Sequence, residues 1–429
     1  MTRLSKVVLA VWLVLAVLIC LLLLQESAAR FSIGPSLPPG KVQPQLISAS
    51  DQAVLLAPDG SLWVWGGTRH NFWGLFGANA RTERPRPLGN ESDWARITAN
   101  DMNILAVKSD GTLWICGANS ILAGGATNLL ELTRFGADTD WQTLSIGVGH
   151  CLALKRDGSL WAWGQNDRGQ VGDASKDHRS TPVRISGSLD WRAVSAGNYN
   201  SFALRGDGTI WGWGRDPVAG GTNDDLAPRQ FEPGTNWAAI AAGAFHLIAL
   251  KRDGTLWIGG RNADRIAPKA HAIPLSPALV QVGTNSHWAE IYSGLDYFIA
   301  RKSDGSWWGA GNRAGQLGLG HFGKTGALQR LPHAYSPWAL AAGGNTTLLL
   351  AKDGTLWNCG IRIGTPERSE RRQRNMTILN DVLELFRLHR RIFNEAPHPC
   401  DRHPAKIWEL PDGLKAQLLS SSQGDAPKP

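Results

Sequence analysis

The segment Trp191–Gly214, which reads WRAVSAGNYNSFALRGDGTIWGWG, holds most of the features that decide the fold. Apolar and β-prone residues fill Ser201–Arg205 and Ile210–Trp213, on either side of Asp207 and Gly208. Asp-Gly between two such runs is a strong hairpin signal, because the turn needs a positive φ that glycine adopts without steric cost. The segment therefore predicts two antiparallel strands joined at Asp207.

This hairpin recurs along the chain. The pattern Asp-Gly-[Ser/Thr]-x-Trp occurs seven times, at intervals of 46 to 51 residues. Its members are Asp59, Gly60 and Trp63; Asp110, Gly111 and Trp114; Asp157, Gly158 and Trp161; Asp207, Gly208 and Trp211; Asp253, Gly254 and Trp257; Asp304, Gly305 and Trp308; Asp353, Gly354 and Trp357. Self-similarity at this period is typical of propellers and solenoids.

Tryptophan is unusually common, with 20 Trp against 4 Tyr and 11 Phe. A second Trp leads most repeats, sixteen residues before the Asp, and in the last repeat it is one residue out of step. These leading residues are Trp94, Trp141, Trp191, Trp237, Trp288 and Trp338. We expect the indoles to fill gaps between neighbouring sheets rather than to form a ligand-binding stripe.

Four short strands fit into each repeat, since the loops between hairpins contain a further β-prone stretch such as Thr181–Ile185. Seven repeats of four strands predict an all-β fold, a seven-bladed β-propeller of four-stranded blades over residues 41–360.

Both termini lie outside the repeats. Val7–Leu24 carries no charge and is long enough for a transmembrane helix, so residues 1–30 are interpreted as a signal anchor, followed by a Pro- and Gly-rich linker at 31–40. Arg3 and Lys6 favour a cytoplasmic N-terminus, which predicts a single-pass membrane protein with an extracytoplasmic propeller, periplasmic or extracellular. A cleaved signal after Ser27–Ala29 and a buried core helix remain alternatives.

The C-terminal extension, residues 361–429, has no repeat. Apolar residues recur with a helical period over Asn375–Phe393, with arginines between them. This predicts an amphipathic helix that packs on the propeller, while binding to a membrane surface or to a partner remains an alternative.

No catalytic, phosphate-binding or zinc-protease motif is found in the sequence. The repeated aspartates are interpreted as turn residues and not as paired catalytic carboxylates. His398, Cys400 and His403 are weak metal-ligand candidates, and a surface loop is the preferred reading. No catalytic residue, metal or cofactor is therefore expected.

Outside the cytoplasm Cys116, Cys151, Cys359 and Cys400 would meet an oxidising medium, and a Cys359–Cys400 disulfide is a hypothesis based on position.

The chain resembles the regulator of chromosome condensation repeat family. The best matches are Val194–Gly214, His150–Gly172 and Asn312–Gly318, and the resemblance covers about residues 41–360. It implies a propeller whose N- and C-terminal strands share one blade, with Lys41–Gln43 as a possible closing strand. It also draws attention to the position seven before each Asp, often His in the family: Gln52, Asn103, His150, Asn200, His246, Tyr297 and Thr346. We interpret this polar ring as hydrogen bonding within blades rather than as a catalytic set.

The resemblance does not settle the function, because members range from a nucleotide exchange factor for the GTPase Ran to photoreceptors and secreted inhibitors. The photoreceptor motif Gly-Trp-Arg-His-Thr is absent. The net charge of +8 is not concentrated in any one region, so nucleic acid is not an expected partner. Our leading hypothesis is a non-enzymatic binding or scaffold propeller that recognises a protein or glycan through its loop faces and is held to the membrane by residues 7–24. Guanine-nucleotide exchange, if the propeller is cytoplasmic, and an enzyme with an unrecognised site are the alternatives.

Overall fold

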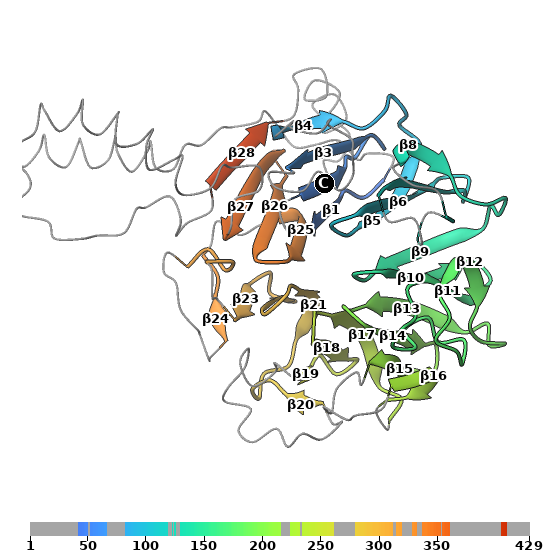
Figure 1. Ribbon diagram of the computed structural model, residues 1–429. Coiled ribbons are helices and arrows are strands. Elements are labelled where there is room, and N and C mark those ends of the chain that lie inside the picture. The colour runs from blue at the N-terminus through green and yellow to red at the C-terminus, as the bar shows by residue number, and fades with distance from the viewer. Residues whose placement is uncertain are drawn as a thin grey trace, which may run out of the picture.

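Seven four-stranded antiparallel sheets follow one another in a ring in the computed structural model (Figure 1). The structure describes residues 42–49, 52–66, 82–118, 122, 124–125, 129–215, 224–231, 234–260, 279–311, 315–319, 328–332, 337–352, 354–360 and 405–409. Within these residues every regular element is a strand. The predicted all-β propeller of seven four-stranded blades is therefore confirmed.

Each blade uses four consecutive strands. Blades 1 and 2 comprise β1 (Gln45–Ala49), β2 (Gln52–Leu56), β3 (Leu62–Gly66), β4 (Thr82–Pro87), β5 (Trp94–Ala99), β6 (Asn103–Lys108), β7 (Leu113–Gly117) and β8 (Leu129–Arg134). Blades 3 and 4 comprise β9 (Trp141–Ile146), β10 (His150–Lys155), β11 (Leu160–Gly164), β12 (Arg179–Arg184), β13 (Trp191–Ala196), β14 (Asn200–Arg205), β15 (Ile210–Arg215) and β16 (Asp224–Gln230).

The second half of the ring is built in the same way. Blades 5 to 7 comprise β17 (Trp237–Ala242), β18 (His246–Lys251), β19 (Leu256–Gly260), β20 (Val280–Gln281), β21 (Trp288–Ser293), β22 (Phe298–Lys302), β23 (Trp307–Ala310), β24 (Gln329–Arg330), β25 (Pro337–Gly343), β26 (Thr346–Ala351), β27 (Thr355–Gly360) and β28 (Ala405–Glu409).

The antiparallel order gives the propeller two distinct faces. Every Asp-Gly turn joins the second strand of a blade to the third, and we call the end that carries these turns the Asp-Gly face. The opposite end, the loop face, carries the turns between first and second strands and the connections from third to fourth strands.

The hydrophobic core lies between neighbouring blades. Leu154 and Leu160 of blade 3, for example, pack against Trp191 and Trp213 of blade 4. In blades 2 to 6 the leading Trp also meets the Trp after the turn of its own blade edge-on, as Trp141 meets Trp161 with ring centroids 5.9 Å apart. A buried indole removes roughly 200 Å² from water, which favours folding by about 5 kcal/mol at ~25 cal/mol per Å². The indoles thus fill inter-blade gaps, as the sequence predicts.

The ring closes differently from the expectation. The family resemblance implied a blade shared by both ends of the chain, but blade 1 takes all its strands from residues 45–87. Val42 and Gln43 lie outside any strand, and Lys41 lies outside the described residues. The outer strand of blade 7 is β28, which pairs with β27 and comes from the segment assigned to the C-terminal extension.

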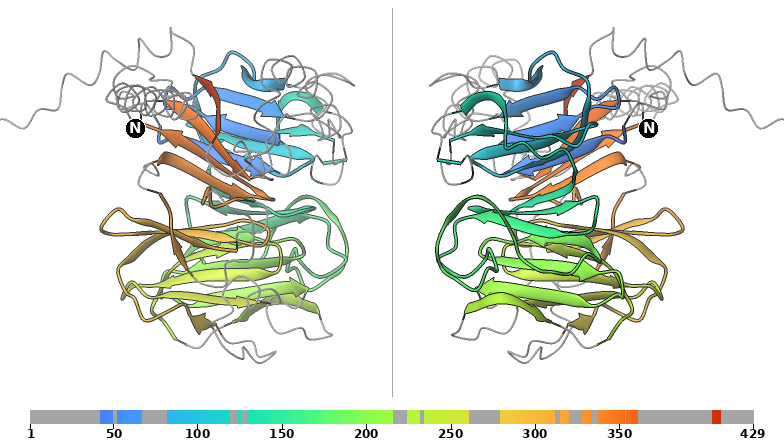
Figure 2. Two further views of the ribbon diagram at one scale, coloured as in Figure 1. Left: turned by 90° about the vertical axis from the view of Figure 1, so that its left-hand side faces the viewer. Right: turned by 90° about the vertical axis from the view of Figure 1, so that its right-hand side faces the viewer.

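Side-chain packing joins the first blade to the last, which lie side by side in Figure 2. Leu46 and Leu55 of blade 1 contact Leu348 and Leu350 of blade 7 in one buried cluster. A Cβ at Gly343 would lie 1.9 Å from the Ser48 carbonyl oxygen, so the inner strands β25 and β1 approach closely. Hydrophobic contact, rather than a shared sheet, therefore closes the ring.

The predicted N-terminal span over residues 7–24 and the predicted helix at 375–393 lie outside the described residues. Among the residues that are described, no helix has the length and apolar character needed to cross a membrane.

Candidate functional site

The repeated aspartates are engaged in hydrogen bonds within their turns. Oδ1 of Asp157 accepts the Ser159 backbone N–H at 2.8 Å and the Ser159 hydroxyl at 2.6 Å. The Ser159 Oγ in turn accepts the indole N–H of Trp161 at 2.8 Å. The Ser159 hydroxyl holds the pKa of the Asp157 carboxyl below its usual value. This relay explains why Asp, Ser or Thr, and Trp recur at fixed spacing.

The relay is repeated in other blades, in the turns that begin at Asp59, Asp110, Asp207, Asp253 and Asp304. In the last blade Trp357 donates to Thr355, while Asp353 lies outside the described residues. These carboxylates serve the turns, which leaves them poorly placed for acid–base chemistry.

A cation lies between the two indoles of most blades. Nζ of Lys155 is 4.8 Å from the ring centroid of Trp141 and 4.5 Å from that of Trp161. It also pairs with Asp138 at 3.0 Å and Asp140 at 3.1 Å. Equivalent stacks are formed by Lys108, Arg205, Lys251 and Lys302. This cation is not among the residues predicted from the sequence, although a basic residue recurs two positions before the Asp in these five blades.

The polar ring joins neighbouring blades, so the prediction of bonds within each blade is wrong for its described contacts. Nε2 of His150 in blade 3 lies 2.9 Å from Oγ of Ser201 in blade 4. Nε2 of His246 in blade 5 lies 2.8 Å from Oγ of Ser293 in blade 6. Tyr297 of blade 6 donates to the carbonyl of Thr346 in blade 7 at 2.6 Å. The side chains of His150, His246 and Tyr297 reach the neighbouring blade, which the sequence spacing alone does not reveal.

His150, the member of the polar ring in blade 3, is shielded from solvent. His150 is fully buried, and this burial lowers the pKa of its imidazole to about 4. A Cβ on Gly147 would come within 2.6 Å of the His150 ring, so the small residue there makes room for the imidazole. His150 is therefore a neutral structural group at physiological pH.

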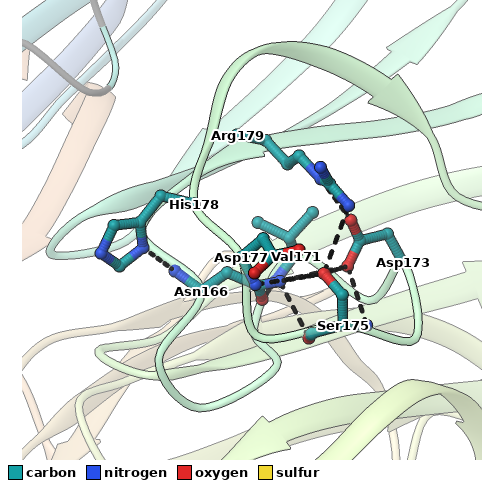
Figure 3. Close-up of polar contacts among 7 residues, drawn as sticks. All are labelled: Asn166, Val171, Asp173, Ser175, Asp177, His178 and Arg179. Carbon is teal, nitrogen blue, oxygen red and sulfur yellow. Dashed lines mark hydrogen bonds and ion pairs between the residues drawn. The ribbon is translucent and has the colours of Figure 1, made fainter.

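The connection between β11 and β12 begins with the end of the family-like segment His150–Gly172 and is drawn in Figure 3. Its centre is the buried Asn166, whose side chain donates to Asp173 at 3.1 Å and accepts the N–H of Val171 at 2.8 Å. Arg179 pairs with Asp173, and the Asn166 backbone N–H donates to Nδ1 of His178 at 3.0 Å.

These polar groups hold the loop's own shape. The Ser175 hydroxyl donates to Asp173 at 2.8 Å and accepts a bond from Arg179, so it has no histidine base among its described partners. The loop also fixes its neighbour, because the carbonyl of Gln170 accepts the indole N–H of Trp213 in blade 4 at 2.9 Å. The loop is a link between blades with no arrangement suited to nucleophilic catalysis.

Exposed apolar side chains concentrate on the loop face. Met102, Val148 and Phe245 are 36%, 46% and 37% exposed, and they occupy equivalent turns of blades 2, 3 and 5. Tyr199 occupies the same turn of blade 4, half-buried, with the Arg215 guanidinium 6.0 Å from its ring centroid. We call these four residues of consecutive blades the loop-face arc. An apolar set of this kind on a rigid frame is suited to binding another molecule.

The described cysteines form no metal or disulfide site among the residues that the structure describes. Cys116 and Cys151 are free thiols, both are buried, and Cys359 is buried too. Burial raises the pKa of Cys116 to about 12. His398, Cys400 and His403 lie outside the described residues, so the Cys359–Cys400 bridge stays a prediction. Within the part of the chain that is described, no three His, Cys, Asp or Glu side chains are grouped as metal ligands.

Comparison with known proteins agrees with this architecture. The Regulator of chromosome condensation (RCC1) repeat matches residues 157–204, and a second description of that repeat matches residues 141–170. No curated protein matches the chain.

Solved structures share the fold at low sequence identity. Prp20p from Saccharomyces cerevisiae, studied for its binding to Gsp1p and histones, is 18% identical with a TM-score of 0.63, over 78% of this chain and 85% of that one. Human WBSCR16 is 17% identical with a TM-score of 0.61, over 70% and 84%. Yeast RCC1 (Prp20) bound to Kap60 is 18% identical with a TM-score of 0.59, over 73% and 82%. Residues 141–204 therefore match the regulator of chromosome condensation repeat, and the whole described fold is a seven-bladed β-propeller of the kind seen in these solved structures.

Proposed function

We propose that this chain is a non-enzymatic binding propeller that recognises a protein partner through the loop-face arc. The observation that carries the proposal is the exposure of Met102, Val148 and Phe245 in equivalent turns of one face. Apolar side chains favour a protein surface over a glycan, because sugar recognition relies on polar groups beside its aromatic contacts. The inter-blade bonds keep the arc rigid, which lowers the entropy lost on binding.

The proposal also places the propeller outside the cytoplasm, held to the membrane by residues 7–24. The uncharged stretch Val7–Leu24 and the preceding Arg3 and Lys6 support this topology. An alkaline phosphatase fused after Pro429 tests it, since that reporter is active only outside the cytoplasm. A stable but inactive fusion would refute the topology without affecting the binding proposal.

Regulation of a GTPase is the second candidate. It is favoured by the fold similarity to Prp20p, whose described binding properties concern Gsp1p and histones. It requires a cytoplasmic propeller, so the phosphatase fusion separates it from the first candidate.

The binding proposal is tested by proximity labelling with the full chain, followed by binding measurements on the purified partner. Replacing Met102, Val148 and Phe245 together by serine is expected to weaken binding at least tenfold. Leu189→Ser is the matched control, because Leu189 is 54% exposed and lies in the connection that leads into β13, on the Asp-Gly face. Equal binding by the triple variant and the control would exclude the loop-face arc.

A further inference from the structure

The repeat pattern breaks at the junction of blades 6 and 7. In blade 7 the place of the leading Trp is taken by Pro337, and the place of the stacked cation by Ala351. Trp338 is one residue later, and it packs in the cluster between blades 7 and 1. A shift of one residue turns a strand side chain to the opposite face of its sheet. Blade 7 therefore presents no leading indole to blade 6.

Blade 6 differs from the other blades at two positions that face blade 7. Arg301 on β22 replaces an aliphatic residue of the other blades, and Trp307 on the adjacent strand β23 replaces another. The aliphatic counterparts of Arg301 are Leu56, Val107, Leu154, Leu204, Leu250 and Leu350, and those of Trp307 are Leu62, Leu113, Leu160, Ile210, Leu256 and Leu356. Trp307 is 6% exposed and packs with Leu340 and Leu349 of blade 7. Blade 6 thus supplies the indole that blade 7 lacks.

Two further residues of blade 6 complete a polar cluster around the arginine. Nη2 of Arg301 donates to Oε1 of Glu290 in a short ion pair. The Tyr292 hydroxyl donates to Oε2 of Glu290 at 3.0 Å. The Arg301 guanidinium carbon is 5.8 Å from the ring centroid of Trp307, which lies 6.0 Å from that of Tyr292. The guanidinium is therefore held on one side by a carboxylate and supported by an aromatic ring.

The packing between blades 6 and 7 does not by itself explain why Arg301 and Glu290 are charged residues. A partly exposed ion pair adds little to the stability of a fold, and the other blades carry leucine or valine in the place of Arg301. The side chains of Arg301 and Glu290 are 35% and 37% exposed, so the pair reaches the surface. Among the described residues, Nη2 is the one guanidinium nitrogen of Arg301 that bonds to a protein acceptor. The remaining N–H groups are available to a second acceptor.

We propose that Arg301, at the junction of blades 6 and 7, binds a carboxylate side chain of a protein partner. A planar guanidinium that is already oriented accepts a carboxylate in two parallel hydrogen bonds. Glu290 sets the orientation and also neutralises part of the charge, so the site suits a single carboxylate rather than a polyanion. Arg301 and Trp307 lie within three residues of the turn at Asp304, which places the site on the Asp-Gly face, opposite the loop-face arc. The inference rests on the proposed binding function and adds a second contact surface to it.

The test uses the full chain and two fluorescein-labelled peptides, one with paired glutamates and one with glutamines in their place. Fluorescence anisotropy at low salt is expected to show tighter binding of the glutamate peptide, by about tenfold, the effect of one charge-assisted pair. Arg301→Leu introduces the residue that most other blades carry at this position and is expected to abolish this preference. Arg330→Leu, an exposed arginine on the outer strand of the same blade, is expected to keep it within twofold.

Glu290→Gln separates recognition from a structural role. It keeps an acceptor for Tyr292 but removes the competing negative charge, so binding of the glutamate peptide is expected to tighten by about threefold. If Arg301→Leu does not fold, Arg301→Lys replaces it and is expected to weaken the preference, because lysine lacks the planar fork. Equal affinity of the wild-type chain for both peptides overturns the proposal, as does an unchanged preference in the Arg301 variant. A triple loop-face variant that keeps the peptide preference shows that the two surfaces are independent.

Discussion

His150 in blade 3 and Ser201 in blade 4 share a hydrogen bond of 2.9 Å while both side chains are fully buried. Ser201 also donates to the carbonyl of Gln170 at 2.7 Å, in the loop that leaves blade 3. Because Ser201 uses its own proton for Gln170, the imidazole has to donate from Nε2 to the serine oxygen. Through these two hydrogen bonds, Ser201 of blade 4 joins strand β10 to the loop that follows β11.

This arrangement predicts a loss of stability in mild acid. Burial lowers the pKa of His150 to about 4, whereas an unfolded histidine titrates near 6.5. Between these values the unfolded chain binds a proton that the folded chain does not, so stability falls as the pH drops from about 6.5 to about 4. The shift corresponds to roughly 3 kcal/mol at its full extent. Urea unfolding midpoints measured across this pH range check the prediction.

The chain offers a matched variant for this test. Asn103 and Asn200 occupy the ring position in blades 2 and 4, so His150→Asn introduces a residue that the fold already uses there. The variant is expected to show a flatter decline of stability between pH 6.5 and pH 4. An identical pH profile in the two proteins would mean that His150 does not titrate differently on unfolding.

The glycine of the Asp-Gly turn is predicted to be needed for two separable reasons. Gly158 has a φ of +81°, and a Cβ there would lie 2.1 Å from the Leu189 carbonyl oxygen. Gly136 has a similar φ of +78° but nothing within 4 Å of its Cβ position. Gly136→Ala should therefore cost about 1 kcal/mol for backbone strain alone, and Gly158→Ala at least about 2 kcal/mol more because backbone atoms must separate. Denaturant unfolding of the two variants measures the difference, and similar losses would exclude the steric contribution.

The sequence predicts the blades well because their signals are local. Asp207 and Gly208 fix a turn, and Trp191 and Trp211 fix the apolar positions on either side of it, so the repeat can be read without knowing any neighbour. The direction of the His150 side chain cannot be read in this way, because its partner Ser201 lies in the next repeat. The cluster around Arg301 in blade 6 cannot be predicted from its own repeat either, because it depends on the next repeat, where Pro337 replaces the leading Trp of blade 7.

Strand β28, which completes blade 7, could not be predicted from the sequence either. Nothing in the sequence of Ala405–Glu409 marks it as the fourth strand of blade 7, because it has neither an Asp-Gly turn nor a constant distance from β27. Backbone pairing with Thr355–Asn358 defines it instead. The prediction of a strand at Lys41–Gln43 failed because it relied on the family resemblance and on no signal in those residues.

The last blade is predicted to depend on this distant strand. β28 pairs with β27 from Thr355 opposite Glu409 to Asn358 opposite Ala405, so its removal exposes the edge of β27. A chain that ends at residue 404 should lose about 3 kcal/mol of stability, from several ladder hydrogen bonds at ~1 kcal/mol each, and should aggregate through the open edge. A chain that ends at Asp412 keeps the strand and is the control. Hydrogen exchange of the β27 amides checks the pairing directly: faster exchange is expected in the shorter chain only, and equal protection in both would show that β28 does not complete the blade.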